Sequence, residues 1–180
     1  MEKVINSKLL SWYRKNKRNL PWRQTQANNL PDPYFIFVSE YMLQQTTVGT
    51  VKIRFEEFIL KWPTINDLAR ISEKTILKFW SGLGYYSRAR NLLKAAKIIK
   101  KEFNSKIPNN YDDLINLPGI GDYTTKAILG IAYNKSVMPL DANIERILAR
   151  LYGLKLPIIK IKNDLRKKSD NFISKNSLLN

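Results

Sequence analysis

The stretch Leu117-Pro118-Gly119-Ile120-Gly121-Asp122-Tyr123 places two glycines in a short turn between helices predicted at 111–116 and 122–134. Glycine permits unusual backbone angles and the close approach of another backbone. Amide groups in such a turn, and at the start of the following helix, point outward with positive partial charge. The pattern predicts a helix-hairpin-helix that holds a DNA phosphate without reading a base. A plain helical turn with a glycine cap is the alternative, and Ile120 can fix the turn by docking into the core.

A second glycine hinge, Gly82-Leu83-Gly84, is followed by Tyr85, Tyr86, Arg88 and Arg90. An aromatic side chain at such a tip could wedge between bases while the arginines hold phosphates. Alternatively, both tyrosines belong to the core, where aromatic residues are common. The spacing alone leaves both interpretations open.

Two carboxylates lie in apolar surroundings. Glu40 falls in the mostly apolar run 35–43, and Asp141 follows Val137-Met138-Pro139-Leu140. Burial raises the pKa of a carboxyl group, so a buried Glu40 would stay protonated near neutral pH and act as an acid. On the outer face of an amphipathic helix, Glu40 would instead be an ordinary solvated residue. Asp141 precedes a predicted helix and would also serve as its N-cap.

One neutral and one ionised carboxyl group form the arrangement that cleaves glycosidic bonds through an oxocarbenium-like state. An N-glycosidic bond between a sugar and a base needs the same assistance. The acid protonates the leaving base, an effect on the order of 10²–10⁴ in rate, and the anion stabilises positive charge on the sugar. The pair therefore indicates chemistry on DNA.

The charge balance favours a nucleic-acid partner. The 180 residues include 31 Lys and Arg against 15 Asp and Glu, which gives a net charge of +16. An AT-rich genome, which favours lysine codons, is the alternative origin of this charge. A hydrophobic content of 44% excludes a disordered chain.

The chain contains neither histidine nor cysteine. Thiol nucleophiles, disulfides and cysteine-ligated clusters are thereby excluded within it, and no metal site is expected. Proton transfer near neutral pH must come from a carboxylate, a tyrosine or a lysine with a shifted pKa. No apolar run is long enough to span a bilayer, and residues 1–8 do not form a secretory signal. We expect a monomeric, cytoplasmic and nucleoid-associated protein of bacterial type that has no membrane partner.

Apolar residues recur at helical spacing along most of the chain, and strand-like alternation is scarce. The sequence therefore predicts an all-α fold, with the polar segment 24–32 as a surface loop. Helices are expected at 4–16, 33–45, 48–61, 65–71, 73–80, 86–103, 111–116, 122–134, 142–152 and 158–173.

The motifs at 20–23, 39–46, 82–92, 117–124 and 140–143 occur in an order that resembles the adenine DNA glycosylases of the MutY type. These enzymes belong to the helix-hairpin-helix DNA glycosylase superfamily, and the resemblance covers about residues 8–153. It implies an all-α fold of two helical lobes with a cleft between them. It also implies removal of adenine mispaired with 8-oxoguanine or guanine in double-stranded DNA. Base flipping would be required, because the attacked atom is unreachable in the duplex.

The resemblance assigns roles to individual residues. Glu40 corresponds to the acid that protonates adenine, and Asp141 to the carboxylate that stabilises the sugar cation. Asn143 is the companion of that Asp, and Tyr123 orients the carboxylates. The implied base-pocket residues are Trp22, Arg23 and Leu43. The implied DNA-binding residues are Gln45, Leu83, Tyr85, Arg88, Gly119, Ile120, Gly121 and Thr124, among which Gln45 and Tyr85 would enter the base stack.

Position 123 distinguishes two kinds of relative. The endonuclease III glycosylase/lyases, which the chain also resembles, carry there a lysine that attacks the sugar as an amine. Tyr123 therefore predicts a monofunctional glycosylase, with Lys126 one helical turn away. The alternatives are an endonuclease III-like glycosylase/lyase that acts on oxidised pyrimidines, or a non-catalytic DNA-binding remnant.

The chain departs from this family at its C-terminal end. Family members continue into four cysteines that bind a [4Fe–4S] cluster, and then into a domain that recognises 8-oxoguanine. We expect an N-terminal catalytic fragment without a cofactor, whose full-length form would carry the cluster. Residues 1–28 are expected to belong to the second lobe, residues 29–136 to a six-helix-barrel-like lobe with the hairpin, and residues 137–180 to a return into the second lobe, which stops before the cluster region.

Overall fold

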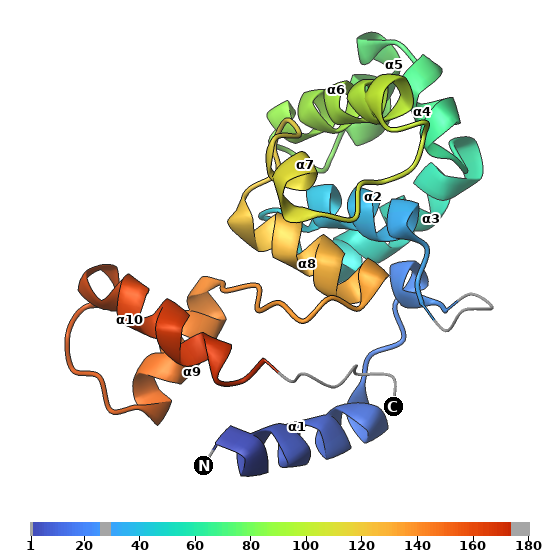
Figure 1. The fold of residues 1–180 in the computed structure, drawn as a ribbon. Coiled ribbons are helices and arrows are strands. Elements are labelled where there is room, and N and C mark those ends of the chain that lie inside the picture. Colours follow the sequence, from blue (N-terminus) through green and yellow to red (C-terminus); the bar gives the residue numbers. More distant parts are fainter. Residues whose placement is uncertain (1, 26–29, 174–180) are drawn as a thin grey trace.

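Helix α2 (Pro33–Leu43) lies at the centre of the fold (Figure 1). Its side chains from Ile36 to Met42 are all buried, and Tyr34 is buried as well. A helix that is largely apolar on every face can only be stable inside a core. Asp32 starts the helix by accepting a 2.8 Å hydrogen bond from the Tyr34 amide, and Pro33 occupies the first helical position. The computed structural model describes residues 2–25 and 30–173.

Six further helices share one hydrophobic core with α2. They are α3 (Val48–Lys61), α4 (Ile65–Arg70), α5 (Glu73–Trp80), α6 (Ser87–Glu102), α7 (Tyr111–Ile115) and α8 (Asp122–Tyr133). Helix α2 packs directly on α3, α6 and α8, while α4 and α5 pack on α6. No β-strand occurs in residues 2–25 and 30–173. The prediction of an all-α fold is thus confirmed.

The remaining helices lie apart from this group (Figure 1). Helices α9 (Ala142–Leu151) and α10 (Ile158–Asp170) bury Leu148, Ile161 and Leu165 in a second, smaller core. Helix α1 (Glu2–Asn16) has no buried residue. It joins this part of the chain through two polar contacts, from the Asn6 side chain to the Phe172 carbonyl and from the Tyr152 hydroxyl to Glu2.

The lobe boundaries 1–28, 29–136 and 137–180 stay a prediction. Leu20 and Trp22, which we assigned to the second lobe, pack in the large core, and Trp22 lies in a short 3-10 helix, η1 (Pro21–Arg23). The ten predicted helices are present to within a few residues. For the loop predicted at 24–32, residues 26–29 lie outside the described residues.

The hairpin between α7 and α8 is built as its glycines suggest. Gly119 has φ +80°, a region that L side chains rarely adopt, and a Cβ added there would lie 2.8 Å from the Asn91 Cβ. Leu117 and Ile120 are buried and anchor the turn. Gly121, in contrast, has an extended backbone and directly precedes α8. Only Gly119 is therefore required by both its backbone angle and its packing.

Replacing Gly119 with alanine is expected to lower the free energy of unfolding by about 1–3 kcal/mol, because the Cβ adds both a strained φ and a clash. Gly49→Ala is the matched control, since Gly49 lies in α3 and the described residues leave space around its Cβ. It should raise stability by up to about 1 kcal/mol. Chemical denaturation measures both changes, and equal stability of the two variants would contradict the role of Gly119.

Candidate active site and DNA interface

Glu40 is a buried carboxyl group on the central helix. Its side chain is 8% exposed, between the fully buried Ser39 and Tyr41. Burial raises the pKa of Glu40 to about 7, against a smaller opposing effect of the positive charge of Arg23. The group is therefore protonated in a large fraction of molecules at neutral pH, as a general acid must be.

Tyr123 at the start of α8 links the two candidate carboxylates. Burial raises the pKa of its hydroxyl, the negative charges of Glu40 and Asp141 raise it further, and the positive charge of Arg23 lowers it. Glu40, Asp141 and Arg23 thus all lie within electrostatic range of one phenol. Because Tyr123 is 42% exposed, this group of residues opens to solvent and can meet a ligand.

The path of the chain explains why Asp141 comes close to Tyr123. Segment 134–141 leaves the end of α8 and runs back along that helix, so that α9 starts near the beginning of α8 (Figure 1). Asp141 caps α9 with Oδ1, which accepts a 2.8 Å hydrogen bond from the Ile144 amide. Its other oxygen accepts from the Asn143 side chain at 3.2 Å. The same side chain therefore serves as a helix cap and belongs to the candidate site.

Arg146 determines how Asn143 faces Asp141, a role that the sequence analysis missed. Its guanidinium donates to the Asn143 side-chain oxygen at 3.3 Å. Because a guanidinium can only donate, it selects the amide orientation in which the nitrogen faces Asp141. The sequence signal was its position, one helical turn after Asn143.

The expected base-pocket residues occupy different environments. Arg23 is exposed, and its positive charge lowers the pKa of both Glu40 and Tyr123. Leu43 is half-buried. Trp22 is 2% exposed and packs edge-on against Phe55 with ring centroids 5.3 Å apart. The indole ring is therefore part of the large core, because its apolar surface is covered by α3.

A cavity of about 790 Å³ adjoins Arg23 between α1, η1 and α8. Among the described residues, no acidic side chain lines it and six basic side chains do: Arg14, Lys17, Arg18, Arg23, Lys126 and Lys135. A hollow with this lining concentrates anions. The hollow would therefore attract an anionic ligand beside the candidate site.

Gln45, just after α2, and Tyr85, just before α6, are exposed residues, and we refer to them as the two tips. Both have left-handed backbones, with φ values of 56° and 46°. Tyr85 is 61% exposed and Gln45 is exposed as well. Such angles are uncommon for residues other than glycine, asparagine and aspartate, and they concentrate at functional sites. The interpretation of Tyr85 as a core residue is therefore wrong.

Four residues expected to bind DNA are buried instead: Leu83, Arg88, Ile120 and Thr124. Leu83 is 5% exposed and belongs to the large core. Arg88 is also 5% exposed, and its guanidinium donates to backbone carbonyls of α2 and of the Gly82–Gly84 hinge. A phosphate-contacting role for Arg88 is thereby corrected, because both Nη atoms of its buried guanidinium already donate to protein carbonyls.

The hairpin exposes backbone groups to solvent, while its larger side chains are buried. Gly119 and Gly121 are exposed, whereas Ile120 and Thr124 are buried. The Tyr41 hydroxyl donates to the Pro118 carbonyl at 2.5 Å, which ties the hairpin to the residue next to Glu40. This link was not predicted, and its sequence signal was only that Tyr41 adjoins the acid.

Asp122 adds an acid to the hairpin, but its charge is balanced. It pairs with Lys126 at 3.0 Å and accepts a 2.9 Å hydrogen bond from the Tyr111 hydroxyl. The exposed backbone amides can therefore still attract a phosphate.

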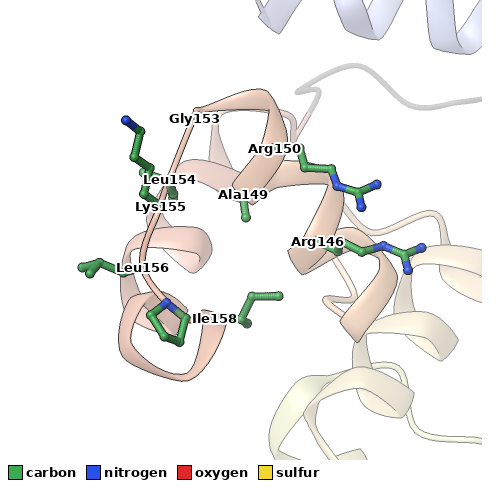
Figure 2. A pocket seen from close by; sticks show the side chains of 9 residues that line it. Arg146, Ala149, Arg150, Gly153, Leu154, Lys155, Leu156 and Ile158 are labelled. Carbon is green, nitrogen blue, oxygen red and sulfur yellow. The ribbon is translucent and has the colours of Figure 1, made fainter.

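A second hollow, of about 570 Å³, lies between α9 and the segment 153–157 that leads into α10 (Figure 2). Arg146 and Arg150 extend to the same side of it, away from Leu156. Neither Glu40 nor Asp141 lines this hollow, although Arg146, which contacts Asn143, does.

The residues present in this chain do not fit the iron–sulfur cluster that the resemblance implies, because the usual ligand side chains are missing from it. The chain has no cysteine or histidine, and residues 2–25 and 30–173 contain no group of three or more His, Cys, Asp or Glu that could hold a metal ion. Within the same residues, no helix is both long and apolar enough to cross a membrane.

Comparisons with known proteins agree on one family. Residues 38–170 match the HhH-GPD superfamily of base excision DNA repair proteins. The chain is 44% identical over 152 residues to the adenine DNA glycosylase of Buchnera aphidicola subsp. Schizaphis graminum, which covers 84% of this chain. It spans only 42% of that relative's length.

Solved structures show the same fold. A thermostable thymine-DNA glycosylase superposes with a TM-score of 0.78 at 28% identity and covers 96% of this chain and 82% of its own. An endonuclease III in a non-covalent DNA complex gives a TM-score of 0.72 at 19% identity, with 93% and 77% covered. The second likeness concerns the fold alone.

Because folding raises the pKa of Glu40, the protonated carboxyl contributes fully to the stability of the folded state below about pH 4.5. This contribution is lost as the pH rises through 7. Glu40→Gln is therefore expected to be more stable than the wild type at pH 8, by about 3 kcal/mol, with a difference that shrinks toward pH 4.5. Denaturant titrations at several pH values measure it. Glu56→Gln, at an exposed position in α3, is the control. A pH-independent difference would contradict the burial of the charge.

Proposed function

The chain belongs to the HhH-GPD superfamily of base excision DNA repair proteins, and from that premise we propose that it hydrolyses the N-glycosidic bond of adenine mispaired with 8-oxoguanine or guanine. One feature carries the proposal: Glu40, buried and with a raised pKa, and Asp141, the N-cap of a different helix, both raise the pKa of Tyr123. The names of relatives such as the Buchnera adenine DNA glycosylase support adenine as the base.

In the proposed reaction, the bond between C1′ and the base nitrogen breaks and its electron pair leaves with the base. Glu40 donates its proton to the leaving base, a contribution on the order of 10²–10⁴ in rate. The Asp141 carboxylate stabilises the cation that develops on the sugar, oriented by Asn143. Water then forms the new bond to C1′, and the ionised Glu40 recovers a proton.

Access to the bond requires the adenine to leave the base stack. The exposed tips Gln45 and Tyr85 are suited to fill the space that the base vacates. The backbone of the hairpin around Gly119 and Gly121 would hold a phosphate of the same strand. The net charge of +16 supports duplex DNA as the partner.

A monofunctional reaction is supported by the side chain at position 123. Its phenol cannot form the imine that an amine forms with the sugar. Lys126, one helical turn from Tyr123, pairs with Asp122 at 3.0 Å. A lyase reaction therefore has no evident nucleophile in the described part of the site.

An excision assay tests the acid. The wild type should produce an alkali-labile site at adenine opposite 8-oxoguanine, and Glu40→Gln should lower the single-turnover rate by about 10²-fold or more, because the leaving base is no longer protonated. DNA affinity should change little, and Glu56→Gln should keep the wild-type rate. Wild-type cleavage by Glu40→Gln would show that the acid is misassigned, and binding without any excision would indicate a DNA-binding module.

Borohydride trapping tests the monofunctional reaction. The wild type should give no covalent adduct with the cleaved duplex, since trapping requires an imine between an amine and the sugar. Tyr123→Lys supplies an amine at the matching position and is the positive control for such an adduct. Efficient trapping by the wild type would favour the endonuclease III-like alternative.

A further inference from the structure

One buried cation connects the two exposed tips. Arg88 Nη1 donates to the carbonyls of Tyr41 at 3.3 Å, of Met42 at 2.8 Å and of Gln44. Nη2 of the same guanidinium donates to the carbonyls of Leu83 at 2.7 Å and Gly84 at 3.1 Å. The group therefore bridges two chain segments that lie far apart in the sequence.

Each segment continues directly into a tip. Gln45 follows Gln44, Tyr85 follows Gly84, and both tips have left-handed backbones and exposed side chains. The Arg88 backbone amide also donates to the Tyr85 carbonyl at 3.0 Å. Neither glutamine nor tyrosine favours this backbone region by itself. The surrounding contacts must therefore impose it, and the contacts of Arg88 lie next to both strained residues.

We propose that Arg88 is a positioning residue, which holds Gln45 and Tyr85 at a fixed separation so that both can enter a DNA base stack together. The planar fork of a guanidinium can serve two groups of carbonyls at once, whereas a lysine ammonium is a single point of charge. This inference deepens the proposed function and rests on it for the identity of the DNA. The coupling between the tips is a property of the protein alone.

Arg54 provides a matched control. Its guanidinium also donates to backbone carbonyls, those of Phe79 and Ser81, and it lies 4.4 Å from the Phe79 ring centroid. It belongs to the same lobe and contacts neither tip. Replacing either arginine with lysine keeps the charge and removes the planar fork.

Hydrogen exchange in the free protein is the first test. Arg88→Lys should speed exchange by about tenfold or more in peptides covering 43–48 and 82–87, while α8 keeps its protection. Arg54→Lys should leave these peptides within about twofold of the wild type. Unchanged tips in Arg88→Lys, or loss of protection in α8 together with the tips, would overturn the proposal.

Fluorescence of 2-aminopurine beside the mispaired adenine is the second test, because it reports unstacking by the tips. Arg88→Lys should lower the wild-type fluorescence increase by about fivefold at saturating protein. In the background Gln45→Ala/Tyr85→Ala, the same substitution should have less than about a twofold further effect, since the tips are already removed. An equal loss in both backgrounds would reduce Arg88 to a structural role.

The two tests separate this inference from the proposed function. Neither needs bond cleavage, so a wild type that unstacks the probe without excising adenine would contradict the proposed function alone. A wild type whose binding leaves the probe stacked would contradict a joint entry of the tips into the duplex.

Discussion

Burial of the Glu40 carboxyl in α2 is the constraint on which the remaining site depends. Helix α2 packs on α3, α6 and α8, so its side chains meet protein on nearly every face. An ionised carboxylate loses its hydration there, which raises its pKa to about 7. The difference from an ordinary glutamate corresponds to about 3 kcal/mol. The large aromatic and aliphatic core around α2 has to supply that free energy.

The second carboxylate, Asp141, comes close to Tyr123 because segment 134–141 is long enough to run back along α8. The 12 residues of α8 span about 18 Å at the rise of an α-helix. Segment 134–141 can cover about 25 Å when extended, which is enough to return to the start of α8. Asp141 then starts α9 near Tyr123, and its capping bond to Ile144 fixes the direction of its carboxylate. The residue that caps α9 is thus also the one that places a carboxylate in the candidate site, and no additional residue has to be ordered for this purpose.

The sequence predicted the features that depend on local patterns. The helices follow from apolar spacing, and the hairpin follows from Gly119, whose φ and close approach to Asn91 no other residue would satisfy. The environment of Glu40 was ambiguous because spacing does not reveal burial in a helix that is apolar on all sides. Trp22 and Arg88 are the opposite case. The resemblance assigned Trp22 to the base pocket, and the glycine-hinge pattern suggested that Arg88 holds a phosphate. Only tertiary packing shows that both are enclosed.

Arg88 shows why a buried cation can be stable in this fold. Removing an ion from water costs several kcal/mol, and burial lowers the pKa of its guanidinium. The carbonyls at the end of α2 carry the negative end of the helix dipole and lack partners within the helix. Five carbonyls accept from the two Nη atoms, and a hydrogen bond to a charged group contributes about 1.5–3 kcal/mol. These bonds offset part of the desolvation, and the cation supports the backbone next to both tips.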